Sequence, residues 1–153
     1  MIKTILVATD PYGKRVLTTP CKRAKMHNAS KTIENLIDTA DYYNMLEREN
    51  NTNEYCCGLA ANQIGENVSI FIYRKHNTWK YMINPLIVYW SKDTILHKEG
   101  CMSMSHSKVI ERHKVIEVMY QTLDSTIMRK ERFTGLTALI IQHEYDHLKG
   151  KLI

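Results

Sequence analysis

The sequence lacks any long apolar run and has few residues that interrupt regular structure. The stretch from Met1 to Asp10 holds too short an apolar run for a signal peptide. No segment approaches the roughly 18 consecutive apolar residues of a membrane span. Only 3 prolines and 6 glycines occur among 153 residues, and no linker, repeat or low-complexity tract is present. We therefore expect a single domain over residues 1–153, in the cytoplasm and not bound to a membrane.

Strong charge is also missing. The formal net charge is +5, and the lysines and arginines are scattered along the chain. A mild excess of this kind suits acidic partners, and ribosomal RNA is one candidate. The alternative is a solvated basic surface, which the scattered distribution favours. We therefore expect no direct, specific binding of nucleic acid.

The four cysteines do not indicate a disulfide framework. They are Cys21, Cys56, Cys57 and Cys101. The adjacent pair, Cys56 and Cys57, is poorly placed to bridge to itself. In a reducing compartment a cysteine is more often a ligand or a nucleophile than a cross-link.

What the sequence does contain is an ordinary globular balance, with 44% hydrophobic and 24% charged residues. Apolar residues at helical spacing predict a helix from Asn28 to about Glu49, capped by Asn28 or Ser30. A polar break follows at residues 50–53. A final run, residues 136–148, predicts a buried helix after Gly135. Residues rich in β-formers predict strands between the helices, at 68–74, 79–83, 86–90, 115–121 and 127–133.

Helix, several strands and helix follow one another without regular βα alternation. This order predicts an α+β fold with mainly antiparallel strands, packed around a buried C-terminal helix.

That C-terminal helix carries the clearest chemical motif, His-Glu-Tyr-Asp-His at residues 143–147. Residues four apart lie on one helical face, so His143 and His147 can ligate one metal ion. Glu144 can then reach a metal-activated water as a proton acceptor. The same pentapeptide also arises by chance on solvent-facing helices, and alone it does not decide between these readings. Apolar flanking residues favour a buried, rigid helix: Leu136, Leu139, Ile140 and Ile141.

Two histidines do not complete a catalytic metal site, which usually takes three protein ligands and leaves a place for water. In metzincin proteases a third histidine follows downstream, but Ile153 occupies that position here. Thermolysin-like proteases use a downstream glutamate, yet only six residues follow His147. The third ligand is therefore expected upstream.

Cys101 is the upstream candidate, because a thiolate is a strong ligand for a divalent metal. A lone cysteine is more often a small buried apolar residue. Its place in the string Glu-Gly-Cys-Met-Ser, residues 99–103, changes that balance, and Gly100 would allow close approach of the backbone.

Three segments together resemble peptide deformylase. The family motif G-x-G-x-A-A-x-Q corresponds to Cys-Cys-Gly-Leu-Ala-Ala-Asn-Gln at 56–63, and E-G-C-x-S is matched at 99–103. The motif Q-H-E-x-D-H-L-x-G is matched in full at 142–150, and an Ile-Asn-Pro step lies at 83–85. The resemblance runs from about residue 55 to the end, in the order of the family.

The resemblance implies a role for each matching residue. Cys101, His143 and His147 would ligate the metal, and Glu144 would be the general base and acid. The Gln63 amide and the Met102 N–H would bind the developing oxyanion. The remaining residues would hold the substrate, through the backbone or as the methionine pocket and its edge: Cys57, Gly58, His97, Glu99, Leu136, Leu139 and Ile140.

The resemblance also implies a cofactor and partners. The family commonly uses Fe²⁺, so one Fe²⁺ ion is expected, with Ni²⁺, Co²⁺ or Zn²⁺ as alternatives that these ligands do not exclude. The substrates would be N-formyl-methionyl nascent peptides, met near the ribosomal exit tunnel. A monomer in the bacterial cytoplasm is expected, or in that of a bacterial host if the protein is phage-encoded.

Departures from the family pattern concern three places. Cys56 replaces the first motif glycine, which costs about 1 kcal/mol or more if that position needs a positive φ. Ser105 stands where many relatives carry proline. The sequence stops at Ile153, as compact and bacteriophage-encoded members do, without the C-terminal helix of other relatives. Arg112 corresponds to a family arginine that follows the second motif, if one residue is missing between the motif and the arginine. It would then pair with Glu99.

Two other functions share some of these features. A small metallopeptidase would also use H-E-x-x-H, but the absent downstream ligand and the Glu-Gly-Cys-Met-Ser string count against it. A non-catalytic zinc module would need a fourth protein ligand, for which Cys57 is a candidate.

Overall fold

The computed structural model describes residues 1–50 and 55–153. In chain order its elements are α1 (Pro11–Leu17), α2 (Met26–Glu49), β1 (Gly58–Ala60), the 3₁₀ turn η1 (Ala61–Ile64), β2 (Ile70–Lys75), β3 (Thr78–Trp90), β4 (Thr94–Glu99), β5 (Lys108–His113), β6 (Val115–Thr122), β7 (Ser125–Thr134) and α3 (Gly135–Leu148).

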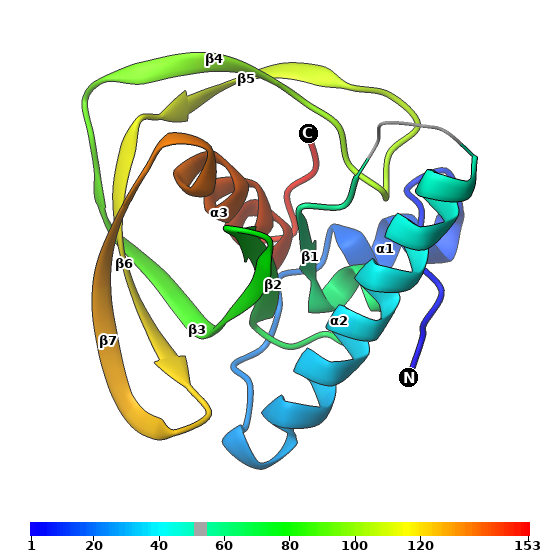
Figure 1. Cartoon of the computed structure of the whole chain (residues 1–153), viewed down its shortest axis with the longest axis horizontal. Helices are drawn as coiled ribbons and strands as arrows, with labels where there is room; N and C mark the ends of the chain where they lie inside the picture. The colour runs from blue at the N-terminus through cyan, green and yellow to red at the C-terminus, as the bar shows by residue number, and fades with distance from the viewer. Residues whose placement is uncertain (51–54) are drawn as a thin grey trace.

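The strands form one five-stranded sheet, ordered β1-β2-β3-β6-β7, and a separate β4–β5 hairpin. All of these pairings are antiparallel. The sheet curves strongly, so that α3 lies inside it while α2 packs on the opposite side (Figure 1). The predicted α+β fold with antiparallel strands around a buried C-terminal helix is thus confirmed.

Strand β2 explains how the sheet is covered on both faces. Alternate residues of a strand point to opposite sides. Ile70 and Ile72 therefore join a core with α2, while Phe71 and Tyr73 join a second core with α3. All four are buried. Helix α3 is therefore fixed against the inner face of a sheet whose outer face is covered by α2.

The start of α2 differs from the prediction. The helix begins at Met26 after Lys25, which makes no side-chain capping bond. Asn28 and Ser30 lie inside the helix, so the predicted cap was wrong. A contact with a distant residue determines where the helix begins. The Asn84 side chain accepts from the Ala24 N–H at 2.7 Å and donates to the Ala24 C=O at 3.1 Å, which fixes the chain just before the helix. Asn50 ends the helix, and the rest of the predicted polar break lies outside the described residues.

Strand β3 joins two segments that were predicted as separate strands, 79–83 and 86–90. The register with β6 shifts between Ile83 and Leu86, around the Asn84–Pro85 step. Asn84 has φ of +50°, an unusual value that Asn tolerates better than most residues. Its side chain also donates to Gln121 at 2.8 Å on the neighbouring strand. The interruption is therefore a bulge within one strand.

Helix α3 is buried as expected, with one exception. Ala138, Ile141 and Leu148 are buried in the core, but Leu136 is 61% exposed. The expectation that Leu136 helps to bury the helix was therefore wrong. Leu136 lies in the first turn after Gly135, which has φ of +60°, and faces a cavity mouth instead of the sheet.

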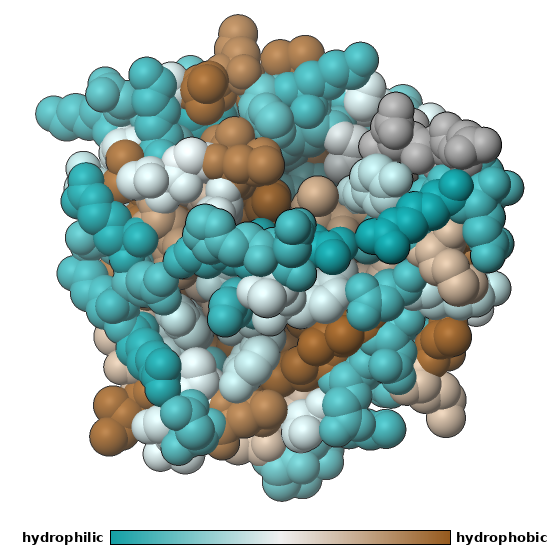
Figure 2. All heavy atoms as spheres, in the orientation of Figure 1, coloured by the Kyte–Doolittle hydropathy of each residue, from teal (hydrophilic) through white to brown (hydrophobic). Residues whose placement is uncertain are grey.

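The surface is largely polar, with local apolar areas. Figure 2 shows apolar side chains gathered over the β4–β5 hairpin, where Ile95, Leu96 and Val109 are exposed. Among the described residues, no helix combines the length and the apolar character that crossing a membrane requires.

Candidate active site

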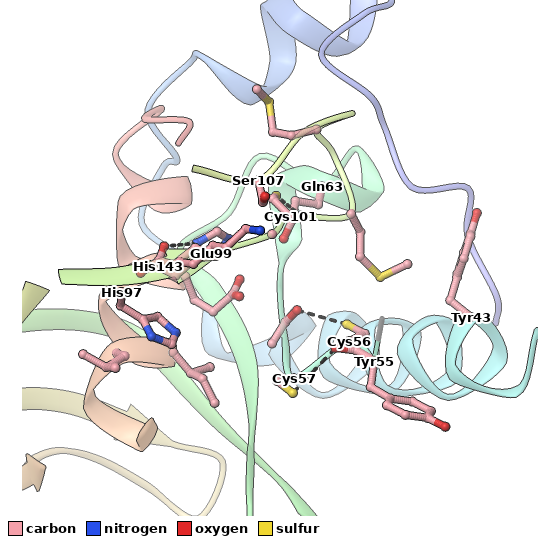
Figure 3. Close-up of a pocket in the computed structure, with 18 of the residues that line it drawn as sticks. Tyr43, Tyr55, Cys56, Cys57, Gln63, His97, Glu99, Cys101, Ser107 and His143 are labelled. Atoms are coloured by element: carbon pink, nitrogen blue, oxygen red, sulfur yellow. Dashed lines mark hydrogen bonds and ion pairs between the residues drawn. The ribbon is translucent and has the colours of Figure 1, made fainter. Parts of the chain in front are cut away.

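A cavity of about 1060 Å³ opens between α2, β1, the segment after β4 and helix α3. It brings together nearly every predicted site residue, from three separate parts of the sequence. Figure 3 shows Tyr43 and Tyr55 at one end, His97 at the other, and Cys101 with His143 between them. The predicted residues that line it are Cys57, Gly58, Gln63, His97, Glu99, Cys101, Met102, Leu136, Leu139, Ile140, His143 and Glu144. His147 is buried, at 1% exposure, directly behind this wall.

Three side chains converge to form a candidate metal centre. The ligand atoms of Cys101, His143 and His147 all lie within 4.8 Å of one another. The Nε2 atom of His147 is 3.2 Å from both the Cys101 Sγ and the His143 Nε2. Helix α3 supplies both imidazoles one turn apart, and the loop after β4 supplies the thiol. This donor set, two imidazoles and a sulfur, is one that zinc, iron, cobalt and nickel all accept.

A buried ion-pair network holds the histidine from behind. Glu99 accepts a hydrogen bond from His143 Nδ1 at 2.8 Å, which turns Nε2 toward the other ligands. Arg112 donates to both Glu99 oxygens at 2.7 and 2.8 Å, and to Asp146 at 2.6 Å. The pairing of Arg112 with Glu99 is therefore present. A second carboxylate, Asp146, joins it from α3 itself.

The charges around the candidate metal centre favour a cation there. Burial lowers the pKa of His143, but hydrogen bonds with Cys101 and Glu99 outweigh burial and raise it to about 10. Burial lowers the pKa of His147 to about 3, so this imidazole is neutral and offers a lone pair. Burial raises the pKa of Glu99, yet its bonds from Arg112 and His143 outweigh that and lower it to about 2. A divalent ion fits a place where anionic neighbours favour positive charge beside a neutral imidazole.

Glu144 lies beside this centre and is almost completely buried. Burial raises the pKa of its carboxyl group to about 7. Within the described residues, Oε2 has no hydrogen-bond partner. A carboxylate with a pKa near neutrality and a free oxygen at a cavity wall is suited to accept and return a proton.

Gly58 explains why a glycine is needed at this position of the first motif. A Cβ added there would lie 2.8 Å from both the Cγ and the Cδ of Glu144, closer than real side chains approach. The β1 backbone is thus packed directly against the carboxylate.

Cys56, two residues earlier, stands where the family motif has its first glycine. Its φ is not positive, so the replacement of that glycine by cysteine has no such backbone cost here.

Hydrogen bonds at both ends of its side-chain amide fix the orientation of Gln63. Its Oε1 accepts from the backbone N–H of Ala60 at 2.9 Å, which directs the NH₂ group the other way. That group lies 3.1 Å from the Ser103 hydroxyl and 3.6 Å from the Cys101 sulfur. Gln63 therefore presents a donor to the centre, in an orientation that two partners fix.

Met102 lies in the turn that follows the cysteine. The turn is closed by a bond from Met104 N–H to Cys101 C=O at 2.9 Å. The N–H of Met102 has no acceptor in the part of the chain that the structure describes. It is available to a ligand in the cavity.

Several contributors to the site were not predicted. Ser103 was in the second motif, but its contact with Gln63 spans 40 residues of sequence. Asn44 bonds the backbone of Cys56, and Tyr43 with Tyr55 extends the cavity along α2. Nothing in the local sequence marks Asn44, because its partner lies beyond the end of the helix.

The fold and the site together define a class. A buried H-E-x-x-H helix, one thiol from a separate loop and a carboxylate at a cavity wall are the parts of a single-metal hydrolase.

Comparisons with known proteins identify the family. A family model described as Polypeptide deformylase matches residues 2–153. The peptide deformylase of Thermotoga maritima is 36% identical over 150 residues, covering 93% of this chain and 84% of the relative. The crystal structure of the Thermotoga maritima enzyme aligns with a TM-score of 0.83 and 34% identity, over 99% of this chain and 95% of that one. A probable peptide deformylase from Synechococcus phage S-SSM7 gives a TM-score of 0.80 at 26% identity, over 99% and 97%.

The chain belongs to the peptide deformylase family. Its activity is the metal-dependent removal of the N-terminal formyl group from formyl-methionyl nascent peptides, which releases formate.

Proposed function

We propose that Cys101, His143 and His147 hold the single metal ion of this deformylase, and that Glu144 carries the proton. The convergence of the three ligand atoms within 4.8 Å is the observation that carries this assignment. When bound there, a divalent ion supplies Lewis acidity and makes water a nucleophile near neutral pH. We propose Fe²⁺ as the native ion, with Ni²⁺, Co²⁺ or Zn²⁺ able to replace it.

The protein groups divide the remaining chemistry. Glu144 accepts a proton from the attacking water, and the oxygen of that water bonds to the formyl carbon. The Gln63 amide and the Met102 N–H donate to the formyl oxygen as negative charge develops on it. Glu144 then returns the proton to the departing nitrogen as the C–N bond breaks. The products are formate and a peptide with a free N-terminal amine.

The rest of the cavity would bind the peptide. The methionine side chain would enter between α3 and β4, against Leu136, Leu139 and Ile140, with Cys57, His97 and Glu99 around it. The backbone of Gly58, beside Glu144, would pair with the peptide backbone. We place the enzyme as a monomeric, single-domain catalyst over residues 1–153. It would act in the cytoplasm of a bacterium, or of a phage host, near the ribosomal exit tunnel.

The direct test is formate release from a formyl-Met-Ala-Ser peptide, with metal content measured on the same sample. An unblocked Met-Ala-Ser peptide is the control. We expect formate from the first and no cleavage of the second. Cleavage of internal peptide bonds would instead support a metallopeptidase.

A matched pair of variants tests the ligand set. Cys101→Ala should lower metal occupancy sharply, because it removes the anionic ligand, while Cys21→Ala should not. Equal metal content in the two proteins would overturn the assignment of Cys101.

Metal identity has its own test, which follows activity in air. If the native ion is Fe²⁺, oxidation of the iron or of the Cys101 thiolate removes the catalyst or its ligand. Iron-loaded enzyme should lose activity fastest, and nickel-loaded enzyme should persist. Equal lifetimes would reject the redox argument and leave the deformylase assignment intact.

A further inference from the structure

Strand β1 is an edge of the five-stranded sheet, so one side of its backbone is not paired with any other strand of residues 1–50 and 55–153. Gly58 stands opposite Tyr73 on β2. The N–H of Arg74 donates to the C=O of Cys57 at 2.8 Å, just beside this pair. In an antiparallel ladder, bonded and non-bonded pairs alternate. The N–H and C=O of Gly58 therefore point away from β2, as do those of Cys56 and Ala60, and Gly58 itself lines the cavity.

Side-chain amides already bond the open edge on both sides of Gly58. The Asn44 side chain accepts from the Cys56 N–H at 2.8 Å and donates to the Cys56 C=O at 3.2 Å, as a neighbouring strand would. The Ala60 N–H donates to the Gln63 amide oxygen at 2.9 Å. Gly58 lies between these two positions. Within the described residues its N–H has no acceptor.

In the described part of the chain, the C=O of Gly58 has one hydrogen-bond partner, the thiol of Cys56. The Cys56 Sγ lies 3.1 Å from this oxygen, and the bond is among those drawn in Figure 3. The thiol is 3% exposed, and burial raises its pKa, so it keeps its proton and acts as a donor. A carbonyl oxygen has two lone pairs, so one remains for a ligand. Cys56 is also the residue that departs from the glycine of the family motif.

We propose that Asn44 and Cys56 are positioning residues, which hold Gly58 as the one open pairing point of β1 and so set the register of the formylated peptide. Asn44 fixes the backbone two residues before Gly58, and Cys56 fixes the Gly58 carbonyl. Because Gly58 packs against the Glu144 side chain, its position determines how a paired peptide places its formyl group at that carboxylate. This inference rests on the proposed function of the site.

The occupant follows from the geometry. An extended peptide carries one N–H and one C=O per residue on each edge, which matches a strand edge. With one open position beside Glu144, only the residue that bears the formyl group can pair there productively. A shift along the strand would meet backbone groups that Asn44 and Gln63 already bond.

The test is a double-mutant cycle measured by formate release. Cys56→Ala should lower kcat about threefold and Asn44→Ala about tenfold, with smaller changes in KM. Because both act through Gly58, the double variant should lose about tenfold, less than the thirtyfold product of independent effects. Cys56→Ser keeps a hydroxyl donor and should restore most of the loss.

The matched control is Asn35→Ala. Asn35 is also buried on α2, but its amide bonds Glu66 at 3.0 Å and not β1. Asn35→Ala should leave kcat within about twofold of wild type. In the double variant with Cys56→Ala, the two reductions in kcat should multiply as independent effects. Unfolding in urea, measured for each variant, separates stability from positioning. If Asn44→Ala does not fold, Asn44→Asp keeps the acceptor for the Cys56 N–H and replaces it in the cycle.

Two outcomes would overturn the inference. One is a double variant that loses the full thirtyfold product, and the other is an equal loss of kcat in Asn35→Ala and Asn44→Ala. In either case wild-type enzyme would still release formate, so this failure is distinct from failure of the proposed function, in which the wild type itself releases none.

Discussion

The two sides of the cavity are built by different means. On the metal side, helix α3 supplies His143, Glu144 and His147 from five consecutive residues, and buried charges hold them in place. On the peptide side, β1 is only three residues long, and two side-chain amides bond its open edge. The Gln63 amide lies three residues after Ala60, and the Asn44 amide comes from α2 to bond Cys56. The first side depends on buried ion pairs, and the second depends on hydrogen bonds to backbone groups.

This difference shows that local spacing in the sequence fixes one part of the site, while contacts between separate elements fix another. A ligand pair on a helix needs a fixed local spacing, because residues four apart must share a face. A strand edge needs only that its unpaired groups find partners, and any correctly placed amide suffices. A single local motif therefore encodes His143, Glu144 and His147, whereas the contact of Asn44 with Cys56 depends on how α2 docks. Variants on the two sides should fail in different ways.

The largest expected effect is on the metal side, at Glu144. Glu144→Ala should keep the metal and lower kcat by about 10² to 10⁴, the usual contribution of a positioned general base. The variant removes the proton carrier but none of the proposed ligands. The measurements are kcat from formate release and metal content of the same sample. Wild-type turnover with full metal loading would show that Glu144 does not carry the proton.

Arg112 tests whether the metal side depends on buried charge. Arg112→Met leaves two carboxylates, of Glu99 and Asp146, without their partner. Removing one member of a buried ion pair typically costs about 3–5 kcal/mol. The free energy of unfolding in urea should fall by about that amount. Metal affinity should fall about 10–100-fold, because Glu99 no longer has a fixed position behind His143.

An exposed arginine provides the control for Arg112. Arg132 lies 3.8 Å from Glu117, and its side chain is 60% exposed. Arg132→Met should change the free energy of unfolding by no more than about 1 kcal/mol, because solvent screens such pairs. Equal destabilisation by the two variants would mean that burial is not what makes the Arg112 network matter.

Gln63 contributes to both sides, since its amide oxygen bonds β1 while its NH₂ group faces the metal centre. Gln63→Ala should lower kcat by about 10² to 10³ and raise KM less, because the donor matters most when the formyl oxygen carries charge. Ser103→Ala, which removes one partner that orients the amide, should cost less than Gln63→Ala. A change in KM alone would make Gln63 a ground-state binder of the peptide.

The elements that were predictable from sequence share one property, which is a long and regular pattern. Helices α2 and α3 and strands β2, β6 and β7 were located to within a few residues, because apolar residues at helical spacing or runs of β-forming residues mark each of them. The convergence of Cys101, His143 and His147 was also predictable, since these residues lie within two short motifs. The bend of β3 at Asn84 was read as a break, because a bulge and a turn look alike in a sequence.

The elements that were missed are short or depend on distant partners. Helix α1 has only seven residues, although Asp10 caps it and Pro11 opens it as local rules predict. Among the strands that the structure describes, β4 and β5 pair only with each other, and they remain largely exposed, so they carry little hydrophobic pattern. The Asn44 contact with Cys56 could not be inferred, because it depends on how α2 docks against β1.

The smallest expected effect lies where the two sides meet, at the contact between Gly58 and Glu144. Gly58→Ala adds a methyl group where the Cγ and Cδ of Glu144 would be 2.8 Å away. Overpacking of this kind costs about 1–3 kcal/mol of stability. The carboxylate must also move from its place beside the metal ligands, so kcat should fall about tenfold while metal content stays unchanged.

Gly100→Ala is the matched control for that prediction. Gly100 lies in the wall of the same cavity, but a Cβ there would meet no atom within 4 Å. Gly100→Ala should therefore leave the free energy of unfolding within about 0.5 kcal/mol of wild type. If Gly58→Ala were as stable and as active as Gly100→Ala, the peptide side could shift without disturbing Glu144. The two sides of the cavity would then be mechanically independent, and the position of β1 would no longer determine where the formyl group meets the carboxylate.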